Sequence, residues 1–414
     1  MSRGDVITGH HRVVAASGLA NLGDGVRQVA LPLSAAAITH DAVLVAGLTA
    51  VAYVPWMLFG LPVGALVDRA RPELYVVWAA VLRGALFGAL ALALVLDVRS
   101  MVLLYAVAFP LGVGEAAYDN ASQSLIPRVV ADAVLERANS ALVGVERLGQ
   151  DLIGPAVGGV MFAAAASLPF AVSAAALLLA GVLVTGLRTP APAVAGRPTP
   201  GAVLREAAEG IRWLTGHRFV RTIVVTGAGL TFFTQTWEGL LVLLAVGPMG
   251  TSEAVFGLVL AGGAVGGIVG ALATAPLVRR FPQRALQVAA LAVAAAGDLV
   301  LAAVPTPLCA AVVLSTTSFS FALWNVLSVT IRQRLVPPAV LGRVNAASRT
   351  LSMTAAPLGA LAGGGLAAAL GLRAPLWISG VALVAITGLF VRATRPQLTA
   401  TGRCGVTRTG NPDA

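Results

Sequence analysis

Three carboxylates stand deep inside apolar segments of this sequence: Asp24, Glu115 and Glu146. An apolar cavity favours the neutral acid, so a carboxylate held there can take up and release a proton near neutral pH. We therefore interpret these residues as candidates for binding a coupling proton or cation. The alternative interpretation is structural: Asp24 pairs with Arg27, one helical turn further on, and the pair only holds helices together.

Three more ionisable residues lie in apolar segments and are weaker candidates. Asp119 and Asp298 could lie close to a membrane surface, where a charge costs less, and they therefore rank lower. Arg83 lies in the middle of its segment, and pairing and function are equally good interpretations of it.

A further set of residues could contact a small-molecule substrate. Glu238 follows Trp237 and a Phe-Phe pair, a combination that suits a cationic or aromatic compound. Arg27, Trp324 and Asn325 could line the same cavity. The aromatic residues could equally well serve in ordinary helix packing or in an interfacial belt.

The composition identifies the elements that must position these residues. Of 414 residues, 57% are hydrophobic and only 11% are charged, against roughly 25% charged residues in soluble domains. The mean hydropathy is +0.87. Apolar runs long enough to cross a hydrocarbon core of roughly 30 Å recur along the chain. We predict an all-α integral membrane protein with twelve transmembrane helices, at 12–37, 43–67, 73–96, 100–122, 139–163, 168–187, 219–247, 253–278, 284–304, 306–330, 343–369 and 373–392.

The positive charge, formally +10, is concentrated in alternate loops. By the positive-inside rule, we expect the arginine-rich loops and both termini in the cytoplasm. The abundance of Ala, Gly and Arg is typical of a GC-rich bacterial genome, so the expected location is a bacterial cytoplasmic (inner) membrane. Arginines that are spread over helix ends do not form the single basic face that nucleic-acid binding needs.

A polar, proline-containing segment divides the chain into two halves. We expect an N-terminal six-helix bundle at 1–187, a cytoplasmic linker with an amphipathic helix at 188–218, a C-terminal six-helix bundle at 219–392 and a disordered cytoplasmic tail at 393–414.

The two halves also resemble each other in sequence. The pattern Gln-x-Leu-x-Pro occurs at 123–127 and again at 333–337, and each copy is followed by Leu-x-Arg-x-Asn. Such matches in the same order indicate two parallel repeats. A duplicated unit of this kind places a substrate site between the halves, near the bilayer midplane.

A short charged loop follows the second expected span, and two glycines precede it. Glycines at i and i+4 allow close helix approach, and a carboxylate can interact with the positive N-terminal end of a neighbouring helix. We interpret the run as a latch that closes the cytoplasmic side, with its partner at the start of span eleven: Gly60, Gly64, Asp68, Arg69, Arg71 and Arg343. The alternative is a solvated loop whose arginines serve only topology.

The fifth expected span contains Gly154, Pro155, Gly158 and Gly159. We expect this element to bend the span and to pack tightly against a helix of the other half. The alternative is a proline kink without functional consequence.

Taken together, these motifs resemble the major facilitator superfamily, and within it the bacterial drug-efflux and enterobactin-exporter-like branch. The resemblance covers the chain apart from its termini and part of the 188–218 loop. The run from Gly60 to Arg71 matches the loop 2–3 motif of that superfamily, and 154–159 looks like the final part of the antiporter motif. The chain departs from the family pattern in having no obvious span-four arginine, and in carrying Arg279 where the first-half loop motif has Asp68.

The resemblance implies a secondary active transporter that exports small amphipathic or lipophilic compounds by proton antiport with alternating access. An alternative with the same fold is export of a siderophore or another endogenous metabolite, and the least favoured one is a non-transporting membrane sensor. No clustered His, Cys or Ser residues offer a nucleophile with its base, so we expect no enzyme, and we expect no cofactor or metal. The expected partners are a small-molecule substrate, protons and the lipid bilayer, and the expected state is a monomer.

Overall fold

The computed structural model describes residues 3–67, 71–130, 135–187 and 202–394. These residues are helical apart from short connections, and they contain no strand. The all-helical fold expected from the sequence is therefore confirmed. The elements are α1 (Arg3–Ile38), α2 (Ala42–Val67), α3 (Pro72–Val95), α4 (Met101–Val129), α5 (Leu135–Glu146), the π-helix η2 (Arg147–Ile153), α6 (Gly154–Ala164), α7 (Leu168–Val184), α8 (Ala202–Gly216), α9 (Arg218–Glu238), α10 (Leu241–Val246), α11 (Glu253–Arg280), α12 (Gln283–Ala303), α13 (Pro307–Leu335), α14 (Pro338–Leu370) and α15 (Ala374–Thr394).

Within the described residues, nine helical segments have the length and hydropathy to cross a membrane, and α7 is a shorter apolar helix. Two of the expected spans are interrupted. The span expected at 139–163 consists of α5, η2 and α6, and the one expected at 219–247 consists of α9 and α10. A total of twelve membrane crossings stays a prediction.

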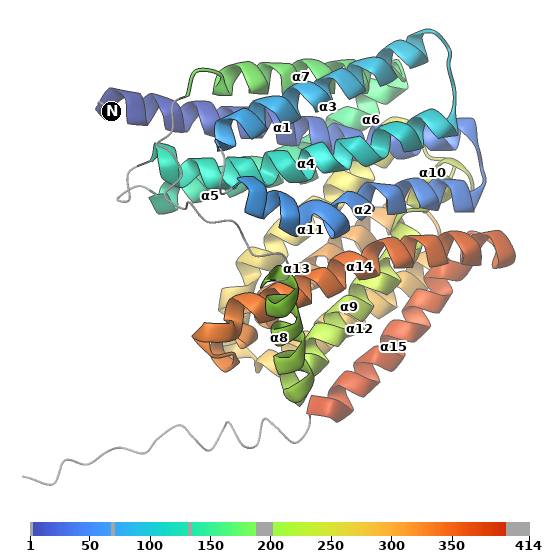
Figure 1. Ribbon diagram of the computed structural model, residues 1–414. Helices are drawn as coiled ribbons and strands as arrows, with labels where there is room; N and C mark the ends of the chain where they lie inside the picture. The colour runs from blue at the N-terminus through green and yellow to red at the C-terminus, as the bar shows by residue number, and fades with distance from the viewer. Residues whose placement is uncertain (1–2, 68–70, 131–134, 188–201, 395–414) are drawn as a thin grey trace, which may run out of the picture.

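Each half of the molecule uses the same set of helix contacts. In the first half, α1 packs on α7, α3 packs on α7 and α4, and α2 packs on α4. In the second half, the corresponding pairs are α9 with α15, α12 with α15 and α13, and α11 with α13. The two groups lie side by side, the blue-to-green helices above and the yellow-to-red helices below (Figure 1). This correspondence supports the internal duplication that the sequence pattern indicates.

The halves contact each other through α2 with α14 and through α6 with α11. Glycines make both contacts close. A Cβ atom at Gly159 would lie only 2.6 Å from the carbonyl oxygen of Glu253, and one at Gly364 would lie 2.8 Å from the Cβ of Ala46. These positions lie near the start of α2 and α11 and near the end of α6 and α14. The halves are therefore tightly joined at one end of the bundle.

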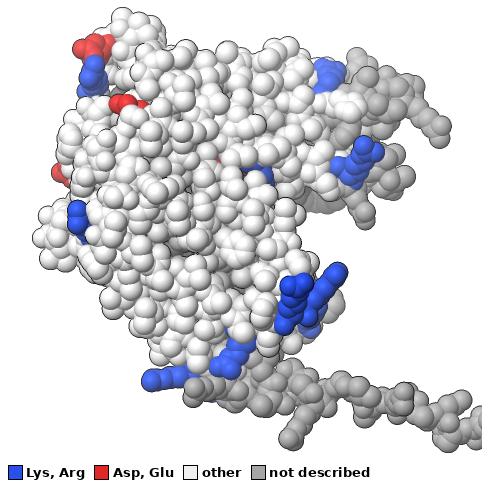
Figure 2. Space-filling model, turned by 180° about the vertical axis from the view of Figure 1, so that it is seen from behind, with Lys and Arg blue, Asp and Glu red and all other residues white. Residues whose placement is uncertain are grey.

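The other end of the bundle carries exposed arginines on both halves, and we call it the arginine-rich end: Arg137, Arg212, Arg279, Arg280 and Arg334. Figure 2 shows that the surface is hollowed between the two halves on this side, with arginines flanking the hollow. The structure is therefore closed at one end and open at the arginine-rich end.

The joined end can be tested with a cysteine pair, Ala46→Cys with Gly364→Cys, in a background that has Cys309 and Cys404 replaced by Ser. Cβ atoms 2.8 Å apart need only a small shift to reach the separation of about 3.5–4.5 Å found in disulfides. Oxidation should therefore link the halves, and reduction should release them. A protease site inserted after residue 190 makes the cross-link visible on a gel.

The two single-cysteine variants are the controls and should give two separate fragments after cleavage. If the double variant also separates after oxidation, the contact between α2 and α14 does not exist in the membrane.

Candidate functional site

The centre of the first half contains a buried ion pair between Asp24 of α1 and Arg83 of α3. Both residues are buried, with exposures of 1% and 0%. Arg83 Nη2 donates a hydrogen bond to Asp24 Oδ1. Gly114 of α4 leaves room for the arginine stem, because a Cβ there would lie 2.6 Å from Arg83 Cγ. The guanidinium also lies 5.9 Å from the centre of the Tyr118 ring, within range of a cation–π contact.

A second buried pair joins α1 to α4. Arg27 Nη2 donates a hydrogen bond of 2.6 Å to Glu115 Oε2. Arg27 Nε also lies 3.7 Å from Asp24 Oδ1, so Asp24 is shared between two arginines. The four residues Asp24, Arg27, Arg83 and Glu115 thus form one charged cluster. The sequence suggested Arg27 as the partner of Asp24, whereas the hydrogen-bonded partner is Arg83.

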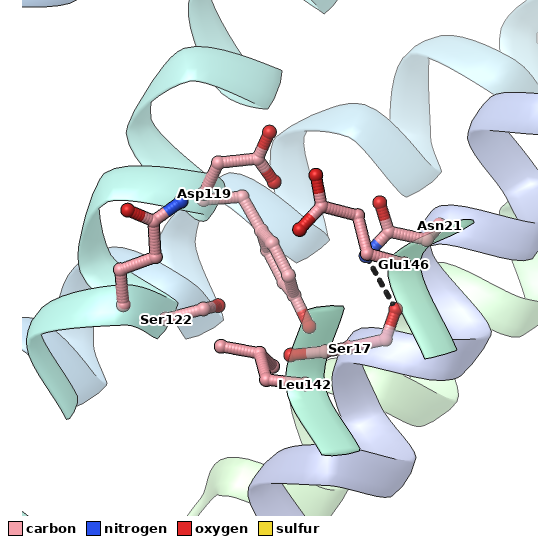
Figure 3. A pocket seen from close by; sticks show the side chains of 8 residues that line it. Ser17, Asn21, Asp119, Ser122, Leu142 and Glu146 are labelled. Atoms are coloured by element: carbon pink, nitrogen blue, oxygen red, sulfur yellow. Dashed lines mark hydrogen bonds between the residues drawn. The ribbon is translucent and has the colours of Figure 1, made fainter. Parts of the chain in front are cut away.

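Asp119 and Glu146 face a small pocket beside this cluster (Figure 3). Their carboxylates point into the same space from α4 and α5, and they interact electrostatically. Ser17 and Asn21 of α1 line the pocket as well. Asp119 therefore lies inside the bundle, next to the charged cluster, and its depth in the membrane stays a prediction.

Among the described residues, neither Asp119 nor Glu146 has an ion-pair partner within 4.0 Å; Arg147, next to Glu146, pairs instead with Asp151. Burying a carboxylate without a cation is costly unless it is neutral or reaches water. The region therefore contains more carboxylates than its arginines neutralise by direct pairing, and the additional ones are Asp119 and Glu146. Such groups can carry protons.

Of the residues expected to contact substrate, Glu238 and its neighbours lie next to the boundary between the halves. Gln235 Nε2 donates to Glu238 Oε2 at 2.7 Å and lies 3.5 Å from the hydroxyl of Tyr53 on α2. Glu238 is exposed. Arg27 is paired with Glu115 and is 8% exposed, so it is not free to bind a substrate in this structure.

Trp324 is not a cavity residue in this structure. It is 4% exposed, and its ring packs edge-on against Phe390 with ring centres 5.4 Å apart, inside the second half. Gly227 of α9 makes room for its indole nitrogen. In this structure Trp324 therefore serves helix packing, and a contact with substrate stays a prediction. Asn325, the next residue, is exposed.

The expected latch lies partly outside the described residues, because Asp68 and Arg69 belong to the segment 68–70. Gly60 and Gly64 are on α2. Arg71 Nε donates a hydrogen bond of 2.8 Å to Glu73 Oε1. The contact between Asp68 and Arg343 therefore stays a prediction.

Arg343 has a different partner in this structure. Its Nη1 lies 2.7 Å from Glu209 Oε2, which belongs to α8 in the linker between the halves. A Cβ at Gly210 would lie 2.5 Å from the carbonyl oxygen of Arg343, so glycine is needed for α8 to pack this closely on α14. Figure 1 shows α8 lying across the start of α14.

The small residues of α6 contact helices on two sides. A Cβ at Gly154 would lie 2.6 Å from Gly25 Cα, and one at Gly158 would lie 3.0 Å from Val26 Cα, both on α1. Gly159 faces α11 of the other half. Pro155 is the second residue of α6, the helix that follows η2 directly. Helix α6 thus contacts both α1, which carries Asp24 and Arg27, and α11 at the interface between the halves.

The buried Asp24–Arg83 pair can be tested by its effect on stability. Arg83→Met leaves Asp24 buried without its hydrogen-bonded partner, so the free energy of unfolding should fall by about 3–5 kcal/mol. Adding Asp24→Asn should recover part of this loss. Thermal unfolding of the purified protein in detergent, followed by circular dichroism, measures both effects.

Arg99→Met is the matched control, because Arg99 pairs with Asp97 on the surface, with side chains 62% and 77% exposed. Equal destabilisation by Arg83→Met and Arg99→Met would contradict the buried pair.

Comparison with solved structures shows the type of fold. A mutant form of the nucleoside transporter NupG superposes with a TM-score of 0.79 at 10% identity, covering 93% of this chain and 100% of that one. A bacterial homologue of the human lysosomal transporter Spinster, in an inward-facing and unoccupied conformation, has a TM-score of 0.74 at 15% identity, covering 96% and 99%.

Two curated relatives match most of the chain. An uncharacterised MFS-type transporter, y4rN of Sinorhizobium fredii, is 27% identical over 370 residues, covering 86% of this chain and 88% of the relative. The multidrug efflux pump Tap of Mycolicibacterium fortuitum is 26% identical over 390 residues, covering 88% and 92%. Residues 8–411 match the transmembrane secretion effector family of MFS proteins. The chain is a transporter rather than an enzyme, and it belongs to the transmembrane secretion effector family of the major facilitator superfamily.

Proposed function

We propose that this protein exports small amphipathic or lipophilic, drug-like compounds in exchange for protons. The observation that carries the proposal is the charged cluster of Asp24, Arg27, Arg83 and Glu115, with the further carboxylates Asp119 and Glu146 beside it. Charges are costly at this depth in a membrane and mark ion and substrate pathways. The relative Tap, named as a multidrug efflux pump, supports a drug-like substrate.

Glu115 and Asp24 are the first proton acceptors in this mechanism, and Glu146 is the next. A proton on Glu115 removes the charge that holds Arg27, whose Nε lies 3.7 Å from Asp24. Arg27 then turns towards Asp24, and the link between α1 and α4 loosens. Because α1 contacts α6, which contacts α11, this local change reaches the interface between the halves.

Alternating access requires two states, each open at one end. This structure corresponds to one of these two states, because glycine contacts close one end and the arginine-rich end is hollowed. We place the arginine-rich end and both termini in the cytoplasm of a bacterial cell, by the positive-inside rule, so this state is inward-open. In the outward-open state the latch of Gly60, Gly64, Asp68, Arg69 and Arg71 closes against Arg343. The protein works as a monomer, because both halves of the pathway lie in one chain.

The substrate binds between the halves, near Gln235, Glu238 and Tyr53. These residues bring one negative charge and two hydrogen-bonding groups to the boundary. A cationic amphipathic compound suits this combination, because it can place its charge against Glu238 and its apolar part against the surrounding helices.

Efflux of the cationic dye ethidium from cells that overexpress the protein tests this function. The wild type should extrude the dye, and a protonophore should stop it. Asp24→Asn and Glu115→Gln should each reduce efflux to the level of cells without the protein, because each removes a site for the coupling proton.

The matched control is Asp97→Asn, which alters an exposed carboxylate and should leave efflux unchanged. Efflux that persists in both Asp24→Asn and Glu115→Gln would show that the proton site lies elsewhere. No efflux from a well-expressed, membrane-inserted wild type would contradict a drug-like substrate and favour a narrow endogenous one.

A further inference from the structure

A carboxylate is buried in the second half, far along the sequence from the charged cluster of the first. Asp298 lies on α12 and is 0% exposed. Ser379 of α15, also 0% exposed, donates a hydrogen bond from its hydroxyl to Asp298 Oδ2. The other carboxylate oxygen, Oδ1, accepts no hydrogen bond from the described residues. Asp298 lies five residues before the end of α12, so its closeness to a membrane surface stays a prediction, although the residue is completely buried among the helices.

The surroundings of Asp298 contain no cation within ion-pair distance among the described residues. The indole N–H of Trp237, on α9, makes no hydrogen bond to the described residues, and it acts electrostatically on the carboxylate of Asp298. On the α13 side, Thr317 packs against Gly297 and carries no charge. The carboxylate of Glu238 also acts electrostatically on Asp298.

These neighbours can satisfy both protonation states of the carboxylate. A serine hydroxyl donates to a carboxylate ion, and it can equally accept a hydrogen bond from a carboxylic acid. The indole N–H helps to stabilise the ion, whereas burial without a cation favours the acid. An indole N–H cannot ligate a metal ion, so the chemistry of this site suits a proton.

Glu238 provides a route from Asp298 to the space between the halves. It directly follows Trp237 in sequence, its side chain is exposed, and it is bonded to Gln235. Gln235 in turn approaches Tyr53 of the first half. A proton on Asp298 therefore has an acidic neighbour that reaches the boundary where we place the substrate.

We propose that Asp298 and Glu238 form a second proton-binding site, located in the C-terminal half and independent of the arginine-paired carboxylates around Asp24. This proposal rests on proton antiport as the proposed function. Asp298 binds the proton beside Trp237, and Glu238 exchanges it with the space between the halves. The transporter then carries a proton in each half, and a cationic substrate at Glu238 competes with the proton bound there.

The direct test is infrared spectroscopy of the purified full-length protein in liposomes during a pH titration, without any substrate. A carboxylic acid has a C=O stretching band that disappears when the acid loses its proton. The wild type should show such a change, and Asp298→Asn should lack one component of it. Ser379→Ala keeps the carboxylate but removes its hydrogen-bonding partner, so it should shift the pH at which this component titrates.

Asp97→Asn is the control, because Asp97 is exposed in a surface loop and its removal should leave the component intact. The proposal is overturned if Asp298→Asn and Ser379→Ala, both folded as judged by circular dichroism, give the same pH-difference spectrum as the wild type. Asp298 would then keep one protonation state and serve only helix packing. If Asp298→Asn does not fold, the Ser379→Ala titration decides alone.

A transport measurement separates this proposal from the function on which it rests. In liposomes with an imposed pH gradient, the ethidium gradient at equilibrium gives the number of protons exchanged per dye molecule. Asp298→Asn should lower this number by one, while dye transport continues because the proton site of the first half is intact. An unchanged number would overturn the second site but not the antiport. Loss of proton dependence in the wild type would overturn both.

Discussion

The structure of the first half depends on placing charges where water cannot screen them. Asp24, Arg27, Arg83 and Glu115 are almost completely buried, and each finds its counter-charge on a different helix. In such surroundings an unpaired charge costs several kcal/mol, so α1 is held to α3 and α4 as long as the pairs are intact. The same pairs weaken when a carboxylate is protonated, which makes a structural contact sensitive to a proton.

Glycines connect the helix that carries Asp24 and Arg27 to the rest of the molecule. Gly154 and Gly158 bring α6 against α1, and Gly159 brings the same helix against Gly257 of α11. Lipid tails are as apolar as the helices, so close backbone approach, rather than hydrophobic burial, holds these surfaces together. Helix α6 therefore contacts both the ion-bearing helix and the other half. The π-helix η2, which precedes it, interrupts the regular hydrogen bonding of the span at this point.

The two halves share a pattern of helix contacts but differ in how they hold buried acids. In the first half arginines pair with Asp24 and Glu115, whereas in the second half Asp298 accepts a hydrogen bond from a serine hydroxyl and has an indole N–H nearby. The linker adds a further asymmetry, because α8 is bound to α14 through Glu209 and Arg343. The two halves thus share a common architecture and differ in the side-chain pairs that they bury.

The apolar runs and the scarcity of charge were enough to predict an all-helical membrane protein, and the paired motifs were enough to indicate its superfamily. The sequence also identified Asp24, Glu115 and Glu146 as buried or half-buried carboxylates within the bundle. It did not reveal that Arg83 is the partner of Asp24, that Trp324 packs inside the second half, or that Asp298 is sealed from solvent. These helices are apolar on most of their faces, so hydrophobic periodicity does not indicate which face is turned inward. The rotation and depth of each helix are set by contacts with its neighbours, and only the tertiary structure decided them.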